Sequence, residues 1–181
     1  MSASTDSARS TRGTSSSTTE TPELLITRIF DAPRELVFQA WTDPEHLRRW
    51  ESAPIGFTVT TEKSDIRPGG EYKVCMRSPE GVDHWLQGVY TEVIPPERLS
   101  FTHAWLRADG TPGVETQVTL TFVDRGNRTE MTLHQTGFDT VSSRDGHNGG
   151  WNSTFDRLAG YLASMNAQHP NPHPNPQQAR S

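Results

Sequence analysis

The sequence predicts an α+β fold in which a curled antiparallel sheet of seven strands wraps a long C-terminal helix, in the order β-α-α-β6-α. Residues 24–135 are typical of short strands, with one small helical insert. The only long amphipathic helix candidate follows at residues 142–164. Its apolar stripe consists of Trp151, Phe155, Leu158 and Leu162, at steps of four, three and four. Such a stripe must be buried against the sheet.

The first strand and the helical insert come before the rest of the sheet. Residues 24–31 are rich in β-branched side chains and indicate a strand. Pro33 suits the first turn of a helix, which we expect to run to Trp41. Thr42–Glu45 is a second helix-start signal, so a short helix to about Trp50 should follow.

Six further strands are expected between the insert and the long helix. They are predicted at residues 57–62, 70–77, 84–94, 98–107, 115–124 and 129–135. Turn-forming sequences such as Ser78–Gly81 and Asp124–Asn127 join them into an antiparallel meander. A twisted sheet of this length curls, and a curled sheet around a helix tends to leave a gap where a ligand can bind. The alternative is that the side chains of the two layers fill each other.

Both ends of the chain lack the apolar residues that a folded domain needs. Ser and Thr make up 13 of the first 22 residues, and the last segment is rich in Pro, Asn and His. Segments of this composition cannot offset their ordering entropy. We therefore predict one domain at residues 23–164, between disordered tails at 1–22 and 165–181.

Composition also limits the function classes. The net charge is −5 and the chain has no Lys/Arg run, which disfavours a nucleic-acid partner. No stretch approaches the length of a membrane span, and the N-terminal region has no apolar signal-peptide core. The one cysteine, Cys75, excludes an internal disulfide and indicates a reducing, cytoplasmic location.

Six sequence pieces, in order along the chain, carry a resemblance to a known family. They are Ala32–Glu45, Leu47–Trp50, Asp65–Tyr72, Met76–Gly81, Gly88–Leu99, and Gly150–Trp151 with Asp156–Ala159. Over nearly all of residues 24–164 the chain resembles the SRPBCC superfamily, also called START-like or helix-grip. Within it, the chain is similar to the branch of the C-terminal domain of the activator of heat-shock protein 90 ATPase. The resemblance implies the helix-grip fold and a cavity between sheet and helix.

The expected cavity wall combines side chains from the strands, the insert and the helix. The apolar members are Trp41, Trp50, Tyr72, Met76, Leu86, Phe101, Trp105, Trp151 and Phe155, and the polar members are His84, His103, Gln135 and His147. Family members often carry His at the position of Gln135, whereas here the histidine is one residue earlier, at His134. The alternative interpretation is that most of these side chains are ordinary core.

The sequence contains neither a nucleophile motif nor a metal-ligand spacing such as HExxH, so we predict no catalytic residue, metal or cofactor. The leading hypothesis is a domain that binds a small, largely apolar ligand. One alternative is a polyketide cyclase- or hydrolase-like enzyme that uses His84, His103 or His147 as acid or base. Another is a protein-interaction or chaperone-activator module, with a protein partner or a homodimer left open.

Overall fold

The computed structural model describes residues 21–50 and 57–168, and its elements follow the predicted order. The strands are β1 (Leu24–Phe30), β2 (Thr58–Ser64), β3 (Glu71–Arg77), β4 (Asp83–Ile94), β5 (Arg98–Trp105), β6 (Thr116–Asp124) and β7 (Thr129–Thr136). The helices are α1 (Arg34–Thr42), α2 (Pro44–Trp50) and α3 (Val141–Gln168). The predicted fold class is therefore confirmed.

The strands form one curled, unclosed sheet with the order β1-β7-β6-β5-β4-β3-β2, and every neighbouring pair is antiparallel. The first strand thus lies beside the last one, which places β1 and β2 at opposite edges. Register shifts between Thr61 and Lys63, and between Tyr90 and Glu92, interrupt the ladders on the β2–β5 side. Irregularities of this kind increase local twist and help the sheet to curl.

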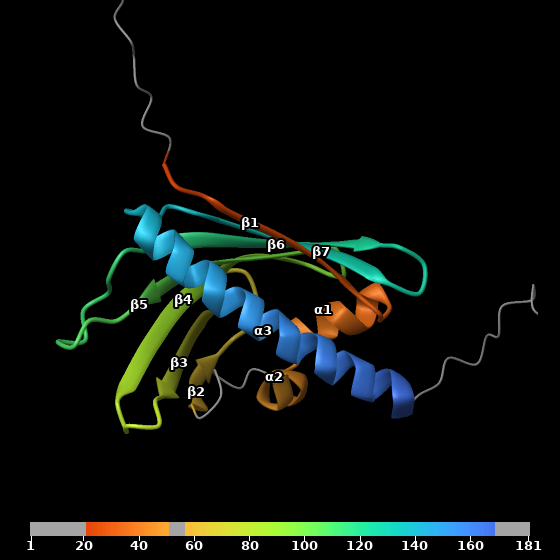
Figure 1. Cartoon of the computed structure of the whole chain (residues 1–181), viewed down its shortest axis with the longest axis horizontal. Coiled ribbons are helices and arrows are strands. Elements are labelled where there is room, and N and C mark those ends of the chain that lie inside the picture. The colour runs from red at the N-terminus through yellow and green to blue at the C-terminus, as the bar shows by residue number, and fades with distance from the viewer. Residues whose placement is uncertain (1–20, 51–56, 169–181) are drawn as a thin grey trace, which may run out of the picture.

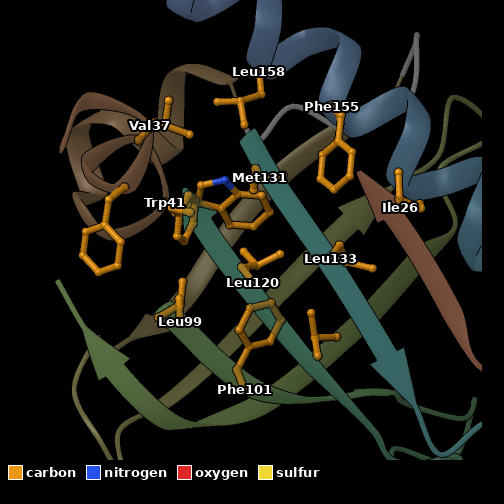
Figure 2. Packing of buried hydrophobic residues seen from close by; sticks show 14 of the residues in the cluster. Ile26, Val37, Trp41, Leu99, Phe101, Leu120, Met131, Leu133, Phe155 and Leu158 are labelled. Atoms are coloured by element: carbon orange, nitrogen blue, oxygen red, sulfur yellow. The ribbon is translucent and has the colours of Figure 1, made fainter. Parts of the chain in front are cut away.

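Helix α3 crosses the sheet diagonally, as Figure 1 shows. It packs closely against β1, α1 and α2 rather than against the β2–β5 half of the sheet. Its stripe residues Phe155, Leu158 and Leu162 are at most 1% exposed. In Figure 2, Phe155 and Leu158 point from the helix toward the buried side chains of the sheet. One part of the interface is thus a closed hydrophobic core.

The helix is longer than predicted at its C-terminal end. It continues beyond Ser164 to Gln168, where Asn166 Nδ2 donates to the Asp31 carbonyl, so the predicted tail boundary at 165 is wrong. At its start, Thr140 Oγ1 accepts the Ser143 N–H at 3.1 Å and caps the first turn. The rest of both predicted tails, 1–20 and 169–181, lies outside the described residues.

Gly88 allows β4 and β5 to approach each other closely. A Cβ at this position would lie 1.8 Å from the Thr102 carbonyl oxygen and 2.6 Å from Tyr72 Cε1. Tyr72 lies across the glycine and donates its hydroxyl to the same carbonyl at 2.8 Å. Only glycine therefore fits between the backbone of β5 and the tyrosine ring.

Gly88→Ala should lower the free energy of unfolding by about 2 kcal/mol or more, because the clash with a backbone oxygen can be relieved only by moving a strand. Urea denaturation measures the loss. Gly160→Ala is the matched control, since a Cβ there meets nothing within 4 Å. That control should be neutral or gain up to about 1 kcal/mol from helix propensity. A Gly88→Ala protein as stable as wild type would contradict the close approach.

Candidate functional site

A cavity of about 450 Å³ lies between α3 and the β2–β5 half of the sheet. Strands β2–β5 contribute Val59, Tyr72, Val74, Met76, Leu86, Tyr90, Leu99, Phe101, His103 and Trp105. The helices contribute Trp41, Leu47, Trp50, Ser142, Ser143, Gly146, His147, Gly150, Trp151, Thr154 and Arg157. Strands β1, β6 and β7 contribute nothing to this wall, because α3 packs on their side of the sheet.

The small residues of α3 leave room for the cavity. Ser143, Gly146, Gly150 and Thr154 recur at steps of three and four, so they share one helix face. A Cβ at Gly146 or Gly150 would meet nothing within 4 Å, and both glycines are exposed. The space beside this face of α3 is therefore open, whereas the face that carries Phe155, Leu158 and Leu162 is filled.

Aromatic rings form most of the apolar wall. On the sheet, Tyr72, Tyr90 and Phe101 form a cluster with ring centroids 5.4–5.9 Å apart. At the insert, Trp41 packs edge-on to Trp50 at 4.9 Å. Trp50 is only 2% exposed and donates its indole N–H to the Ala40 carbonyl at 2.7 Å, which ties α2 to α1. The wall is therefore held by packing between several elements.

His147 lies on the cavity wall, where both of its ring nitrogens are engaged by protein groups. Trp105 Nε1 lies 3.3 Å from His147 Nε2, and an indole nitrogen can only donate. Nε2 must therefore accept, which leaves Nδ1–H to donate to the Ser143 carbonyl at 2.8 Å. Both ring nitrogens thus have partners within the protein.

His103 lies beside His147 and is more deeply buried. The two ring centroids are 5.3 Å apart, and His103 is 6% exposed. Burial, followed by the proximity of His147, lowers the pKa of His103 to about 3. Its Nδ1 is buried and has no hydrogen-bond partner among the described residues. His103 is therefore uncharged at neutral pH and contributes mainly an aromatic surface.

Gln135 lies behind the cavity wall and not on it. Its side chain is 0% exposed, and its Oε1 accepts the Trp151 indole N–H at 2.7 Å. Its Nε2 donates to Thr116 Oγ1 at 2.8 Å, and that hydroxyl donates to the His103 carbonyl at 3.0 Å. Every polar atom of the amide thus has a protein partner, and the amide positions Trp151.

The comparisons with known proteins agree with this geometry. Residues 31–163 match the family model described as Activator of Hsp90 ATPase homolog 1-like protein. The chain belongs to this AHSA1 family. The match spans the insert, the sheet and most of α3, so it covers every residue of the cavity wall.

Solved structures of similar proteins show the same fold as this AHSA1 chain. The AHSA1 protein from Silicibacter pomeroyi is 26% identical with a TM-score of 0.72, over 80% of this chain and 99% of that one. A protein from Chromobacterium violaceum is 26% identical with a TM-score of 0.70, over 77% and 96%. An Arthrobacter aurescens protein is 25% identical with a TM-score of 0.70, over 84% and 93%. No curated protein matches the chain.

Most of the side chains predicted from the sequence lie on the cavity wall of this AHSA1 domain, but three do not. Gln135 is fully buried behind the wall, where it bonds to Trp151. Phe155 is 1% exposed and packs against Phe30 and Trp41 in the core. His84 is exposed, because the β3–β4 hairpin extends away from α3, as Figure 1 shows. His84 and Leu86 are two residues apart, so they share one face of β4. This spacing does not show how far along the strand the cavity extends.

Part of the wall was not predicted from the sequence. The missed residues are Leu47, Val59, Val74, Tyr90, Leu99, Ser142, Ser143, Gly146, Gly150, Thr154 and Arg157. The apolar members on strands, Val59, Val74, Tyr90 and Leu99, lie at alternate positions and could have been found by extending the same parity, whereas Leu47 lies on helix α2. The small residues of α3 and Arg157 gave no signal, because a search for bulky apolar residues does not detect a face made of glycine, hydroxyls and one cation.

The described part of the AHSA1 chain was also searched for a metal site, a thiol in the cavity and a membrane-spanning helix. Residues 21–50 and 57–168 contain no group of three or more His, Cys, Asp or Glu side chains that could hold a metal ion. Cys75 is buried and does not line the cavity, and burial, with Asp83 nearby, raises the pKa of its thiol. Within the same ranges no helix has the length and apolarity needed to cross a membrane.

The low pKa of His103 predicts a pH dependence of stability. Because the folded-state pKa lies near 3 and the unfolded value near 6.5, the unfolded chain binds the proton first. The stability contributed by neutral His103 is complete above about pH 6.5 and is lost as the pH falls toward 3. Between pH 7.5 and 5 this amounts to about 2 kcal/mol.

Urea denaturation of wild type and His103→Phe across this pH range measures the contribution. The variant should lose about 2 kcal/mol less than wild type between pH 7.5 and 5. His84→Phe controls for removal of an exposed histidine. Parallel curves for wild type and His103→Phe would show that His103 is not buried in its neutral form.

Proposed function

We propose that this AHSA1-family domain binds a small, largely apolar molecule in the cavity between α3 and strands β2–β5. The observation that carries the proposal is an open cavity of about 450 Å³ with a mainly aromatic and aliphatic wall. Cavities of this size and composition are typical of small-molecule sites. Folds of the SRPBCC type generally bind hydrophobic ligands, which supports the same function.

The polar groups around the cavity favour an apolar ligand. The nitrogens of His147 bond to Trp105 and to the backbone, and the Gln135 amide bonds to Trp151 and Thr116. These two side chains are already satisfied, so a ligand has little to gain from offering them hydrogen bonds. The aromatic and aliphatic rest of the wall offers an apolar ligand a large area to cover.

The enzyme alternative receives less support from the same geometry. A general base needs a free lone pair within reach of the substrate. His147 Nε2 is occupied by Trp105, and a pKa near 3 makes His103 a weak base. His84 is exposed and lies off the cavity wall. We therefore favour binding over acid–base catalysis.

We also propose a cytoplasmic location, since Cys75 is a free thiol and the chain has no second cysteine. The protein-interaction module and the homodimer stay predictions from the sequence.

Gly150→Leu tests the cavity directly. The new side chain would enter the open space beside α3, so the affinity for any ligand of the cavity should fall at least about tenfold, which is 1.4 kcal/mol. The protein should remain folded and gain up to about 1 kcal/mol from the removal of a helix glycine. Ligands are found by thermal-shift screening of apolar metabolites and confirmed by native mass spectrometry, since a bound ligand raises the Tm.

Gly149→Leu is the matched control. Gly149 is the preceding residue, is equally unobstructed and does not line the cavity. This variant should bind as wild type does. The proposal is wrong if no apolar compound raises the Tm of the wild-type protein, or if Gly150→Leu and wild type bind the same compound equally well.

A further inference from the structure

Among the described residues of the cavity wall, Arg157 is the only lysine, arginine, aspartate or glutamate. The other polar groups on the described wall are hydroxyl groups, the Tyr72 and Tyr90 phenols, indoles and the two histidines. Arg157 is half-buried, and its burial lowers the pKa of the guanidinium, an effect that neighbouring Asp156 partly offsets. The described part of the wall thus carries one guanidinium among uncharged side chains and two imidazoles.

This cation has no carboxylate partner among the described residues. Its Nη1 donates to Ser153 Oγ at 3.0 Å and its Nη2 to Thr154 Oγ1 at 3.3 Å, both on its own helix. Its Nε is buried and has no hydrogen-bond partner in the described part of the chain. The carboxylate of Asp156 pairs instead with Arg28 of β1 at 3.3 Å.

Each of the other half-buried arginines of the described chain has a carboxylate partner. Arg28 pairs with Asp156, Arg34 with Glu35 and Arg144 with Asp145, each within ion-pair distance. A partly desolvated guanidinium with only neutral acceptors is less stable than one with a carboxylate. Arg157 therefore has unused capacity to bind an anion from the cavity.

The position of Arg157 gives the cavity two chemically different ends. The lining residues of α3 extend from Ser142 to Arg157, a length of roughly 22 Å along the helix. Arg157 lies at one end of this stretch. At the other end, the polar atoms of Trp105 and His147 bond to each other and to the backbone.

We propose that the ligand is an amphipathic carboxylate, whose carboxylate pairs with Arg157 and whose apolar body lies along α3 toward Trp105. This inference rests on the proposed function and specifies its ligand class. A guanidinium offers parallel N–H donors that match a carboxylate. One cation balances one negative charge, which favours a carboxylate over a phosphate monoester with nearly two.

Matched acids and alcohols test the charge of the ligand. The probes are dodecanoate with dodecanol, and 1-naphthaleneacetate with 1-naphthaleneethanol, titrated by calorimetry into the full chain below the aggregation limit of each probe. Within at least one pair, wild type should bind the acid about 10- to 100-fold more tightly, as expected for hydrogen bonds to a charged group. Arg157→Gln should remove this preference and leave the affinity for the alcohol within about twofold.

Arg49→Gln is the matched control. Arg49 is an exposed residue of α2 that does not line the cavity, and its replacement changes the net charge by the same amount. This variant should retain the preference for the acid. Without ligand, Arg157→Gln should melt at the same temperature as wild type or higher, because a half-buried cation has been removed.

The outcomes separate the two proposals. Two results would overturn the proposed pairing of a ligand carboxylate with Arg157 but leave apolar binding intact. One is equal binding of acid and alcohol by wild type, and the other is a preference for the acid that persists in Arg157→Gln. If wild type binds none of the four probes, both the apolar ligand and its carboxylate are overturned. An acid preference that is lost in Arg157→Gln and kept in Arg49→Gln supports the assignment.

Discussion

The arrangement of the site depends on the hydrogen bond between the Trp151 indole and the buried Gln135 amide. The bond is 2.7 Å long. The Gln135 amide also donates to the Thr116 hydroxyl, which in turn donates to the backbone carbonyl of His103. This network links α3 to β7, β6 and β5. An amide that is 0% exposed would be costly without partners, so rotation or sliding of the helix that breaks the network is strongly disfavoured. The network thus fixes which face of α3 looks into the cavity.

With its rotation fixed, α3 presents two neighbouring faces that differ in side-chain size. On one face Phe155, Leu158 and Leu162 fill the space above the sheet. On the other face Ser143, Gly146 and Gly150 leave space for the cavity. Trp151 lies at the boundary and stacks on Phe155 with ring centroids 5.9 Å apart. The same helix therefore supplies both the core that stabilises the domain and the gap that the ligand needs.

The sequence predicted the fold well because its strands and its long helix carry clear periods. Period-two alternation identified Phe101 and Leu86 as inward-facing, and the helical period placed Trp151 on the inner face of α3. Such patterns give the face of a residue but not its distance from the centre of the sheet. His84 has the expected parity and is exposed, while Phe155 lies on the stripe but is covered by neighbouring rings.

Two further features of the site depend on pairings that a sequence does not display. The role of Gln135 depends on the depth at which Trp151 enters the sheet, and the role of Arg157 depends on Asp156 turning toward Arg28. Adjacent residues of a helix point about 100° apart. Asp156 therefore faces β1 while Arg157 faces the cavity, although the sequence suggests a neighbouring ion pair. The chemistry at this end of the cavity is thus set by which side of the helix each charge faces.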